Sequence, residues 1–269
     1  MRDLTEISGF LLDMDGTLYL SNRLLPGAAD FVTYLEESGT PYLLLTNNSS
    51  RSSMAYVQKL ARLGLTVPPE RILTSGSATA QYLRDETPYR RPALFGTPEL
   101  VEEFEAFGFA VVFDEPDAVV LGFDTTLTYE RLTRLCDLVR AGLPYIATHP
   151  DFNCPVEGGF IPDIGATIAF VEASTGRRPD VIIGKPSRTI LEMAAARMGL
   201  PLEGLCMVGD RMYTDIAMGR DAPIQTVLVL SGETRLADLE GSPYLPDHVY
   251  PGVGDLLAAL RKIRAGNAS

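Results

Sequence analysis

Acidic residues end two apolar stretches of the sequence at a spacing that could support phosphoryl transfer. Asp13 and Asp15 end the stretch at 9–15, GFLLDMD, and Asp210 ends LCMVGD at 205–210. Side chains two residues apart on a strand point to the same side. Carboxylates that close repel each other unless a cation or a proton lies between them, and Mg²⁺ meets that need with oxygen ligands. We therefore expect Asp13 to act as a nucleophile and Asp15 as a general acid and base.

Each acidic residue also has a simpler interpretation. Asp13 and Asp15, taken alone, equally fit a turn followed by a helix cap. Asp215 begins a predicted helix, where a carboxylate complements the helix dipole. Its other interpretation is that it orients Lys185 or a metal-bound water, and the sequence leaves both open.

A hydroxyl, an amide and one lysine supply groups that could hold a phosphate. Thr46 and Asn47 end the apolar stretch at 41–47, and Lys185 precedes Pro186. Lysine brings a point charge that suits phosphate. Taken alone, these residues more readily fit simpler roles: helix capping by Asn47, Asn48 or Ser49, and a solvated lysine at a domain edge for Lys185. Lys185 is not a P-loop lysine, because Pro186 stands where that loop has Ser or Thr.

Other catalytic and metal-binding patterns are missing from the sequence. It contains neither GxSxG nor GxGxxG, so neither a serine-hydrolase elbow nor a dinucleotide site is indicated. His149 and His248 are the two histidines, and neither has a ligand-like neighbour. The three cysteines, Cys136, Cys154 and Cys206, are too widely spaced for a disulfide framework or a zinc site. A reducing, cytoplasmic location fits this cysteine usage.

Composition narrows the class of protein and of partner. The chain has 269 residues, of which 46% are hydrophobic and 22% charged, an ordinary globular balance. Its net charge of -12 argues against binding to nucleic acid. The same charge disfavours an anionic substrate unless a cation offsets it. We find no signal peptide and no apolar run long enough to cross a membrane, so we expect no membrane association.

Strand-like and helix-like stretches alternate along the chain, which predicts an α/β fold with a parallel sheet and helices on both faces. Such sheets place their sites at the carboxyl ends of the strands. Strands are expected at 9–15, 41–47, 92–96, 118–123, 144–149, 205–210, 224–230 and 248–250, with a short one near 72–80. Helices are expected at 25–39, 52–64, 97–107, 128–141, 165–175, 187–198, 215–221 and 253–264. We predict a core formed by 1–79 and 181–269, with a second α/β domain inserted at 80–180.

Together, four segments resemble the motifs of the haloacid dehalogenase superfamily of phosphatases. In chain order they are DMDGTLY (13–19), LLTNNS (44–49), GKPS (184–187) and GDRMYTDI (209–216). The insert carries LGFDTTLTYERL (121–132) and ATHPDFNCPVEGGFIPDIGA (147–166), which look like the cap of one branch. That branch is subfamily IIA, the NagD and p-nitrophenyl phosphatase group, and the resemblance covers nearly the whole chain.

The resemblance implies a Rossmann-like core with a C2-type cap and a bound Mg²⁺. Asp13 would attack phosphorus and bind the metal. Asp15 would bind it through the backbone carbonyl and act as acid and base. Asp210 would complete the metal site, and Asp215 would support it through water or Lys185.

The resemblance also assigns residues to the substrate. Thr46 and Asn47 would hold the phosphoryl oxygens, and Lys185 would neutralise nucleophile and phosphate. In the cap, His149, Asn153 and Asp163 are candidates for contacting the leaving group, with ordinary loop structure as the alternative for all three.

We therefore expect a Mg²⁺-dependent phosphatase that hydrolyses a small phosphomonoester through an aspartyl-phosphate. Nucleotides, sugar phosphates, pyridoxal phosphate and phosphoglycolate all remain candidate substrates, and a homodimer through the cap fits the resemblance. Within the superfamily, a dehalogenase and a phosphomutase are the rivals. A protein that binds a metabolite without catalysis is the rival from another class, because fold alone does not exclude it.

Overall fold

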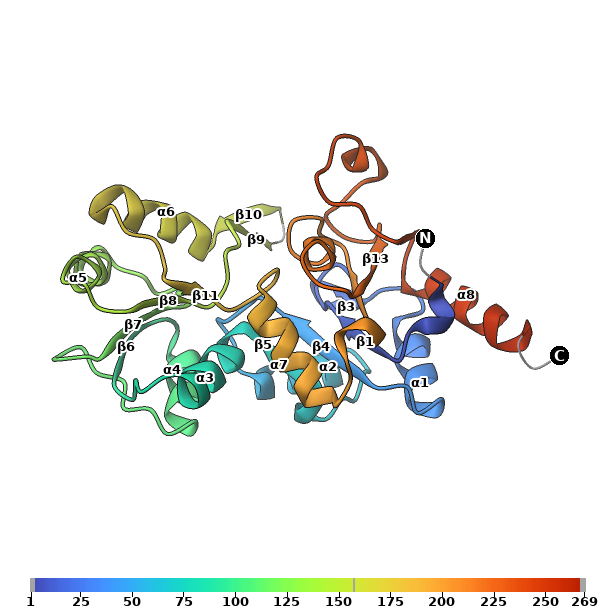
Figure 1. Ribbon diagram of the computed structural model, residues 1–269, viewed down its shortest axis with the longest axis horizontal. Coiled ribbons are helices and arrows are strands. Elements are labelled where there is room, and N and C mark those ends of the chain that lie inside the picture. The colour runs from blue at the N-terminus through green and yellow to red at the C-terminus, as the bar shows by residue number, and fades with distance from the viewer. Residues whose placement is uncertain (1–2, 157, 267–269) are drawn as a thin grey trace. The chain divides into compact units, whose positions relative to one another are not determined.

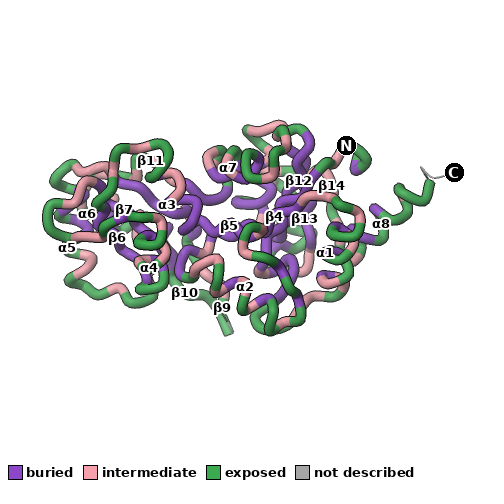
Figure 2. Tube along the Cα trace, turned by 90° about the horizontal axis from the view of Figure 1, so that it is seen from below, coloured by how far each residue is buried: buried purple, intermediate pink, exposed green. Residues whose placement is uncertain are grey.

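The computed structural model describes residues 3–156 and 158–266, which form two compact units. The first unit comprises Met1–Leu45, Val57–Ile72 and Arg188–Ser269. The second comprises Thr46–Tyr56 and Leu73–Ser187. In each unit, buried strands run through the middle and the exposed segments lie around them (Figure 2).

A six-stranded sheet in the order β14-β13-β12-β1-β4-β5 organises the first unit. Neighbouring strands pair in parallel, with Leu11 of β1 opposite Met207 on one side and Leu43 on the other. The strands are β1 (Gly9–Leu12), β4 (Tyr42–Thr46), β5 (Ile72–Thr74), β12 (Leu205–Gly209), β13 (Gln225–Val229) and β14 (His248–Tyr250). Every residue of β1, β12 and β13 is buried, as expected for parallel strands covered on both faces.

Helices α1 (Ala28–Glu37) and α8 (Val253–Gly266) pack against each other in this unit (Figure 1). Their close approach depends on Gly27, where an added Cβ would lie 2.5 Å from the Cα of Gly254. Gly27 also has a φ of 79°, which favours glycine. The remaining α-helices that contribute to this unit are α2 (Ser53–Arg62) and α7 (Arg188–Met198).

The second unit is built on a four-stranded parallel sheet in the order β11-β8-β7-β6. In Figure 1, α3 and α4 lie on one face of this sheet, and α5 and α6 lie on the other. The strands are β6 (Pro92–Phe95), β7 (Ala118–Leu121), β8 (Tyr145–Ala147) and β11 (Val181–Ile182). The helices are α3 (Ser75–Glu86), α4 (Pro98–Ala106), α5 (Tyr129–Arg140) and α6 (Ile164–Thr175).

The α/β class and the parallel sheet are confirmed, and most predicted elements lie within two or three residues of their observed bounds. The domain limits at 80 and 180 remain a prediction. Residue 80 lies inside α3, and β11 pairs with β8 in the four-stranded sheet.

Three local predictions were wrong or incomplete. The helix expected at 215–221 is a short 3-10 helix, η4 (Ile216–Gly219). The stretch at 72–80 holds a strand and the start of α3. Two antiparallel hairpins were missed, because their short or exposed strands carry little apolar signal. They are β2 (Tyr19–Leu20) with β3 (Arg23–Leu24), and β9 (Asn153–Val156) with β10 (Gly159–Pro162).

Further 3-10 helices are η1 (Leu4–Glu6), η2 (Pro69–Arg71), η3 (Leu202–Gly204) and η5 (Leu236–Leu239). Among residues 3–156 and 158–266, no helix has the length and apolar character needed to cross a membrane.

The buried sheet of the first unit makes a direct stability prediction. Leu11→Ala removes a side chain that is fully buried in β1, so we expect the free energy of unfolding to fall by about 2–5 kcal/mol. The control is Leu236→Ala, because Leu236 is 64% exposed, and there we expect a change below about 0.5 kcal/mol. Chemical denaturation measures both values. Equal effects of the two variants would contradict this account of the core.

Candidate active site

Three buried carboxylates meet at the carboxyl ends of β1 and β12. Asp13 follows β1, and Asp210 follows β12, its direct neighbour in the sheet. The backbone N–H of Asp13 donates to the carbonyl of Val208 at 2.9 Å, which continues the pairing to the strand end. Asp13, Asp210 and Asp215 each offer a carboxylate oxygen within 4.8 Å of the others. The sequence predicted all three, and the structure brings them together.

Glycines make room for these carboxylates. An added Cβ would lie 2.4 Å from Oδ2 of Asp210 at Gly16 and 2.0 Å from it at Gly232. At Gly209 it would lie 2.2 Å from Cγ of Asp215. The backbone therefore approaches the acids as closely as only glycine permits.

The hydrogen bonds leave part of this acidic cluster unsatisfied. Oδ2 of Asp210 accepts the backbone N–H of Glu233 at 2.7 Å, whereas Oδ1 is buried with no hydrogen-bond partner among the described residues. Asp215 accepts the backbone N–H of Arg211 at 3.0 Å and makes no capping bond to η4. Its role is therefore not that of a helix cap.

Electrostatics favour a cation at this cluster. Burial, and then the carboxylates of Asp13 and Asp215, raise the pKa of Asp210 well above its usual range. The cluster offers carboxylate oxygens from three acidic side chains, and one of them, Oδ1 of Asp210, has no hydrogen-bond partner among the described residues. Such oxygen ligands suit a hard divalent cation. The residues present therefore fit a metal ion.

Asp15 lies beside the cluster but outside the group of three. Burial is the largest influence on its carboxyl group and raises the pKa of Asp15, and the charge of Asp13 raises it further. Lys59 and Arg211 oppose the shift. A raised pKa keeps a carboxyl group protonated to higher pH, which suits a general acid.

Sequence reasoning missed the segment 231–234, which follows β13 and covers Asp210. Ser231 Oγ donates to the carbonyl of Gly16 at 2.7 Å, and the backbone N–H of Thr234 donates to the carbonyl of Asp210 at 3.2 Å. Its position at the carboxyl end of a predicted strand was the available signal. Arg211 was also missed; its Nε lies 3.1 Å from Oε2 of Glu233.

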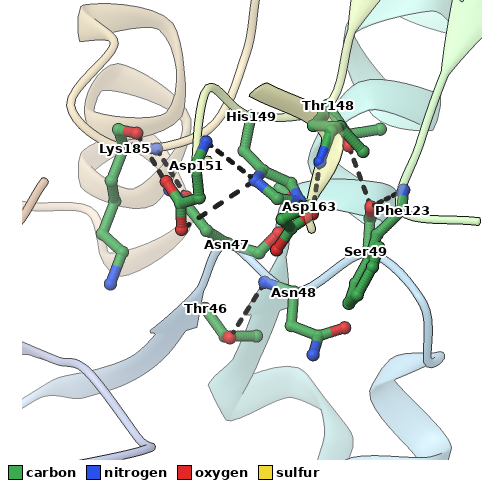
Figure 3. A network of polar contacts seen from close by, with 12 residues as sticks. Thr46, Asn47, Asn48, Ser49, Phe123, Thr148, His149, Asp151, Asp163 and Lys185 are labelled. Atoms are coloured by element: carbon green, nitrogen blue, oxygen red, sulfur yellow. Dashed lines mark hydrogen bonds and ion pairs between the residues drawn. The ribbon is translucent and has the colours of Figure 1, made fainter. Parts of the chain in front are cut away.

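The second unit clamps the backbone of Lys185 with the amide of Asn47 (Figure 3). Oδ1 of Asn47 accepts the N–H of Lys185 at 2.8 Å, and Nδ2 donates to the carbonyl of Lys185 at 2.9 Å. Nδ2 also donates to Oδ1 of Asp151 at 2.9 Å. Lys185 is 2% exposed, so it is not a solvated lysine. The Asn47 side chain is engaged in these contacts and does not cap a helix.

Thr46, the last residue of β4, is also buried, and its Oγ1 accepts the N–H of Asn48 at 3.2 Å. The structure thus places Thr46, Asn47 and Lys185 in the second unit, and the three clustered acids in the first.

The three candidates for the leaving group differ in their surroundings. His149 is fully buried, and its Nε2 lies 3.5 Å from Oδ1 of Asp163. Asn153 is exposed on β9. The structure therefore pairs His149 with Asp163 in the interior and places Asn153 at the surface. Asp151, which contacts both Asn47 and His149, was missed by sequence reasoning.

The raised pKa of Asp210 predicts how stability depends on pH and metal. Above the ordinary Asp value of 3.8 the unfolded chain has lost this proton while the folded chain still holds it. The metal-free protein therefore loses stability from this group as pH rises. Asp210→Asn replaces this carboxyl group with an amide that never ionises, so in EDTA at pH 8 we expect the variant to be more stable than wild type, with a gain that shrinks as pH falls.

Added Mg²⁺ should reverse that order. A ligand at one hundred times its Kd stabilises the native state by about 2.7 kcal/mol, and Asp210→Asn should forfeit most of this gain. Thermal denaturation with EDTA and with Mg²⁺ measures both effects. Equal Mg²⁺ shifts in the two proteins would contradict a metal site at Asp210.

Gly209→Ala places a methyl group where the Asp215 carboxylate lies. We expect it to displace Asp215 and to lower phosphatase activity by about tenfold or more, as is typical when a supporting residue of a metal site moves. Gly252→Ala is the control, because its Cβ would meet only Asp255, at 3.9 Å. Steady-state kinetics of the two variants measure this difference in activity. Full activity of Gly209→Ala would rule out a role for the position of Asp215.

Comparisons with known proteins agree with this geometry. Residues 10–110 match a family model described as haloacid dehalogenase-like hydrolase, and residues 182–256 match one for HAD-like hydrolases. An acid sugar phosphatase of Staphylococcus aureus (strain MRSA252) is 34% identical over 96% of this chain and 100% of its own length.

Two solved structures are similar over most of the chain. A 4-nitrophenylphosphatase from Thermotoga maritima is 47% identical, with a TM-score of 0.91, over 93% of this chain and 96% of that one. NagD from E. coli K-12 is 34% identical, with a TM-score of 0.85, over 92% of this chain and 97% of that one. The chain therefore belongs to the haloacid dehalogenase-like hydrolases, in the group of NagD and the p-nitrophenyl phosphatases, and is a phosphoric monoester hydrolase.

Proposed function

We propose that the protein is a Mg²⁺-dependent phosphatase that hydrolyses small phosphomonoesters through a phosphoaspartate at Asp13. The observation that carries the proposal is the cluster of Asp13, Asp210 and Asp215, with its unsatisfied buried oxygen. Asp13, Asp210 and the backbone carbonyl of Asp15 would hold Mg²⁺, with Asp215 in support. When bound, the ion neutralises negative charge on phosphate and carboxylates.

The reaction divides between two carboxyl groups. An oxygen of Asp13 attacks phosphorus in line, and the bond from phosphorus to the leaving oxygen breaks. Asp15 gives its proton to that oxygen, so that an alcohol leaves. Asp15 then takes a proton from water as the water attacks the phosphoaspartate, which releases inorganic phosphate and restores Asp13. The raised pKa of Asp15 supports its role as the acid in the first half.

Groups of the second unit would bind the phosphoryl oxygens. Lys185 would bring a positive charge to the phosphate, which suits a chain whose net charge is -12. Thr46 offers its hydroxyl. Because the side chain of Asn47 is taken up by Lys185 and Asp151, we assign the contact of Asn47 with phosphate to its backbone N–H.

Sugar phosphates are the substrate class that we favour, because the Staphylococcus aureus relative is an acid sugar phosphatase. Nucleotides, pyridoxal phosphate and phosphoglycolate belong in the same screen. The insert at 80–180 would act as the cap that reads the leaving group, and we retain a homodimer through it and a cytoplasmic location as predictions.

Asp13→Asn removes the nucleophile while keeping its shape, so we expect hydrolysis of p-nitrophenyl phosphate to fall to background and the fold to stay intact. Asp30→Asn, at an exposed position of α1, is the control and should keep full activity. Phosphate release with Mg²⁺ and with EDTA measures both. Undiminished turnover by Asp13→Asn would refute the assignment.

The same assay separates the rivals. A dehalogenase would act without Mg²⁺, a phosphomutase would keep the phosphoryl group on its product, and a binding protein would hold a metabolite without releasing phosphate.

A further inference from the structure

We propose that Asp151 is a positioning residue for Lys185 and acts through the side-chain amide of Asn47. The inference rests on the proposed function, because it explains how the lysine assigned to phosphate is held. All members of the network lie in the second unit and are at least nine-tenths buried: Asn47, His149, Asp151, Asp163 and Lys185.

The clamp on Lys185 has two contacts. Asn47 accepts the N–H of Lys185 and donates to its carbonyl, at 2.8 and 2.9 Å. Such a pair fixes the backbone on both sides of the Lys185 Cα. A side chain that only accepts could make the first contact but not the second.

Asp151 reinforces the orientation of the amide. An Asn amide can be turned over without changing its shape, and only its partners tell the two orientations apart. Turned over, its nitrogen would face the N–H of Lys185, and its oxygen would face a carbonyl and the Asp151 carboxylate. The N–H and carbonyl of Lys185 already disfavour the turned-over amide. Asp151 is a strong acceptor at 2.9 Å with no proton to give, so it reinforces the orientation that clamps Lys185.

Asp151 is itself held from several sides. Its carbonyl accepts the N–H of Gly165 at 2.7 Å, and its own N–H approaches Nδ1 of His149 at 3.4 Å. The glycine is required, because an added Cβ at 165 would lie 2.8 Å from that carbonyl oxygen. At Gly184 an added Cβ would lie 2.6 Å from Oδ1 of Asn47. Neither Gly165 nor Gly184 therefore leaves room for a larger side chain beside Asp151 and Asn47.

His149 joins this network to helix α6. Nδ1 of His149 accepts the N–H of Asp151 at 3.4 Å, and Nε2 faces Oδ1 of Asp163 at 3.5 Å. Asp163 is the N-cap of α6 and accepts the N–H of Ile164 at 2.7 Å. The loop that carries Asp151 is thus anchored at both ends.

The consequence for Lys185 follows from its length. Its ammonium group ends a flexible stem and, in Figure 3, lies away from the Asn47 amide. A small tilt of the backbone displaces that end, and loss of a supporting partner typically costs about 10–100-fold in activity. Asp151 does not need to touch the substrate to have this effect.

The test compares Asp151→Ala with Asp151→Asn in the full chain with Mg²⁺. Alanine removes the acceptor, so we expect kcat/KM for p-nitrophenyl phosphate to fall about tenfold or more and inhibition by inorganic phosphate to weaken. Asparagine keeps an acceptor oxygen, so we expect a loss below about fivefold. Asp137→Ala, at an exposed position of α5, is the control and should match wild type.

A swap of the two side chains keeps the volume and tests the coupling. Asn47→Asp places a carboxylate against Asp151 and the carbonyl of Lys185, so activity should fall. Adding Asp151→Asn gives the pair a donor again. The double variant should therefore have a kcat/KM at least about three times that of Asn47→Asp alone. Because both changes are isosteric, this arm remains informative if Asp151→Ala fails to fold.

Lys185→Met separates the inference from the proposed function. If that variant keeps wild-type activity and phosphate inhibition, the proposed role of Lys185 fails. Two outcomes would overturn the positioning role of Asp151 alone. In the first, Lys185→Met loses activity and phosphate inhibition while Asp151→Ala keeps both. In the second, the double variant Asn47→Asp, Asp151→Asn loses as much activity as its two single changes predict when they act independently.

Discussion

Repulsion between buried carboxylates is the constraint on which the active site depends. Asp13, Asp210 and Asp215 place their oxygens within 4.8 Å of each other in the interior. Like charges at that distance are costly in a medium of low dielectric constant. The fold tolerates these carboxylates for two reasons. Backbone N–H groups donate hydrogen bonds to some of their oxygens, and nearby glycines leave space for the side chains. A bound cation would contact the remaining oxygens. Binding and stability are therefore linked, since the groups that hold the ion are those that destabilise the protein without it.

The acidic cluster and the Asn47 amide differ in how far their polar atoms are paired. In the acidic cluster, an oxygen of Asp210 has no hydrogen-bond partner among residues 3–156 and 158–266, which suits a binding site. The Asn47 amide uses its oxygen and both N–H groups, which is the arrangement of a support. A buried polar network in which members satisfy one another is rigid and defines a single arrangement.

Sequence patterns predicted the parts of the site that depend on strand ends. Asp13 and Asp210 follow apolar strands, and because parallel strands end at one edge, their convergence could be inferred without coordinates. Asp151 could not be found in this way, because its role comes from contacts with Asn47, 104 residues away in the sequence. The helix expected at 215–221 is the 3-10 helix η4, and nothing in the sequence pattern separates the two kinds of helix at that length. The hairpin of β9 and β10 was missed because each strand has only four residues and contains a proline, which argues against a strand.

The most direct test of the account is to locate the phosphoryl group during turnover. Asp15→Asn should slow the second half of the reaction, so that acid quenching after mixing with p-nitrophenyl phosphate and Mg²⁺ traps the intermediate. Peptide mass spectrometry should then find one phosphoryl group on Asp13 with Mg²⁺ and none with EDTA. A phosphoryl group on another residue, or turnover by wild type with no phosphorylated peptide in either protein, would contradict the proposed reaction.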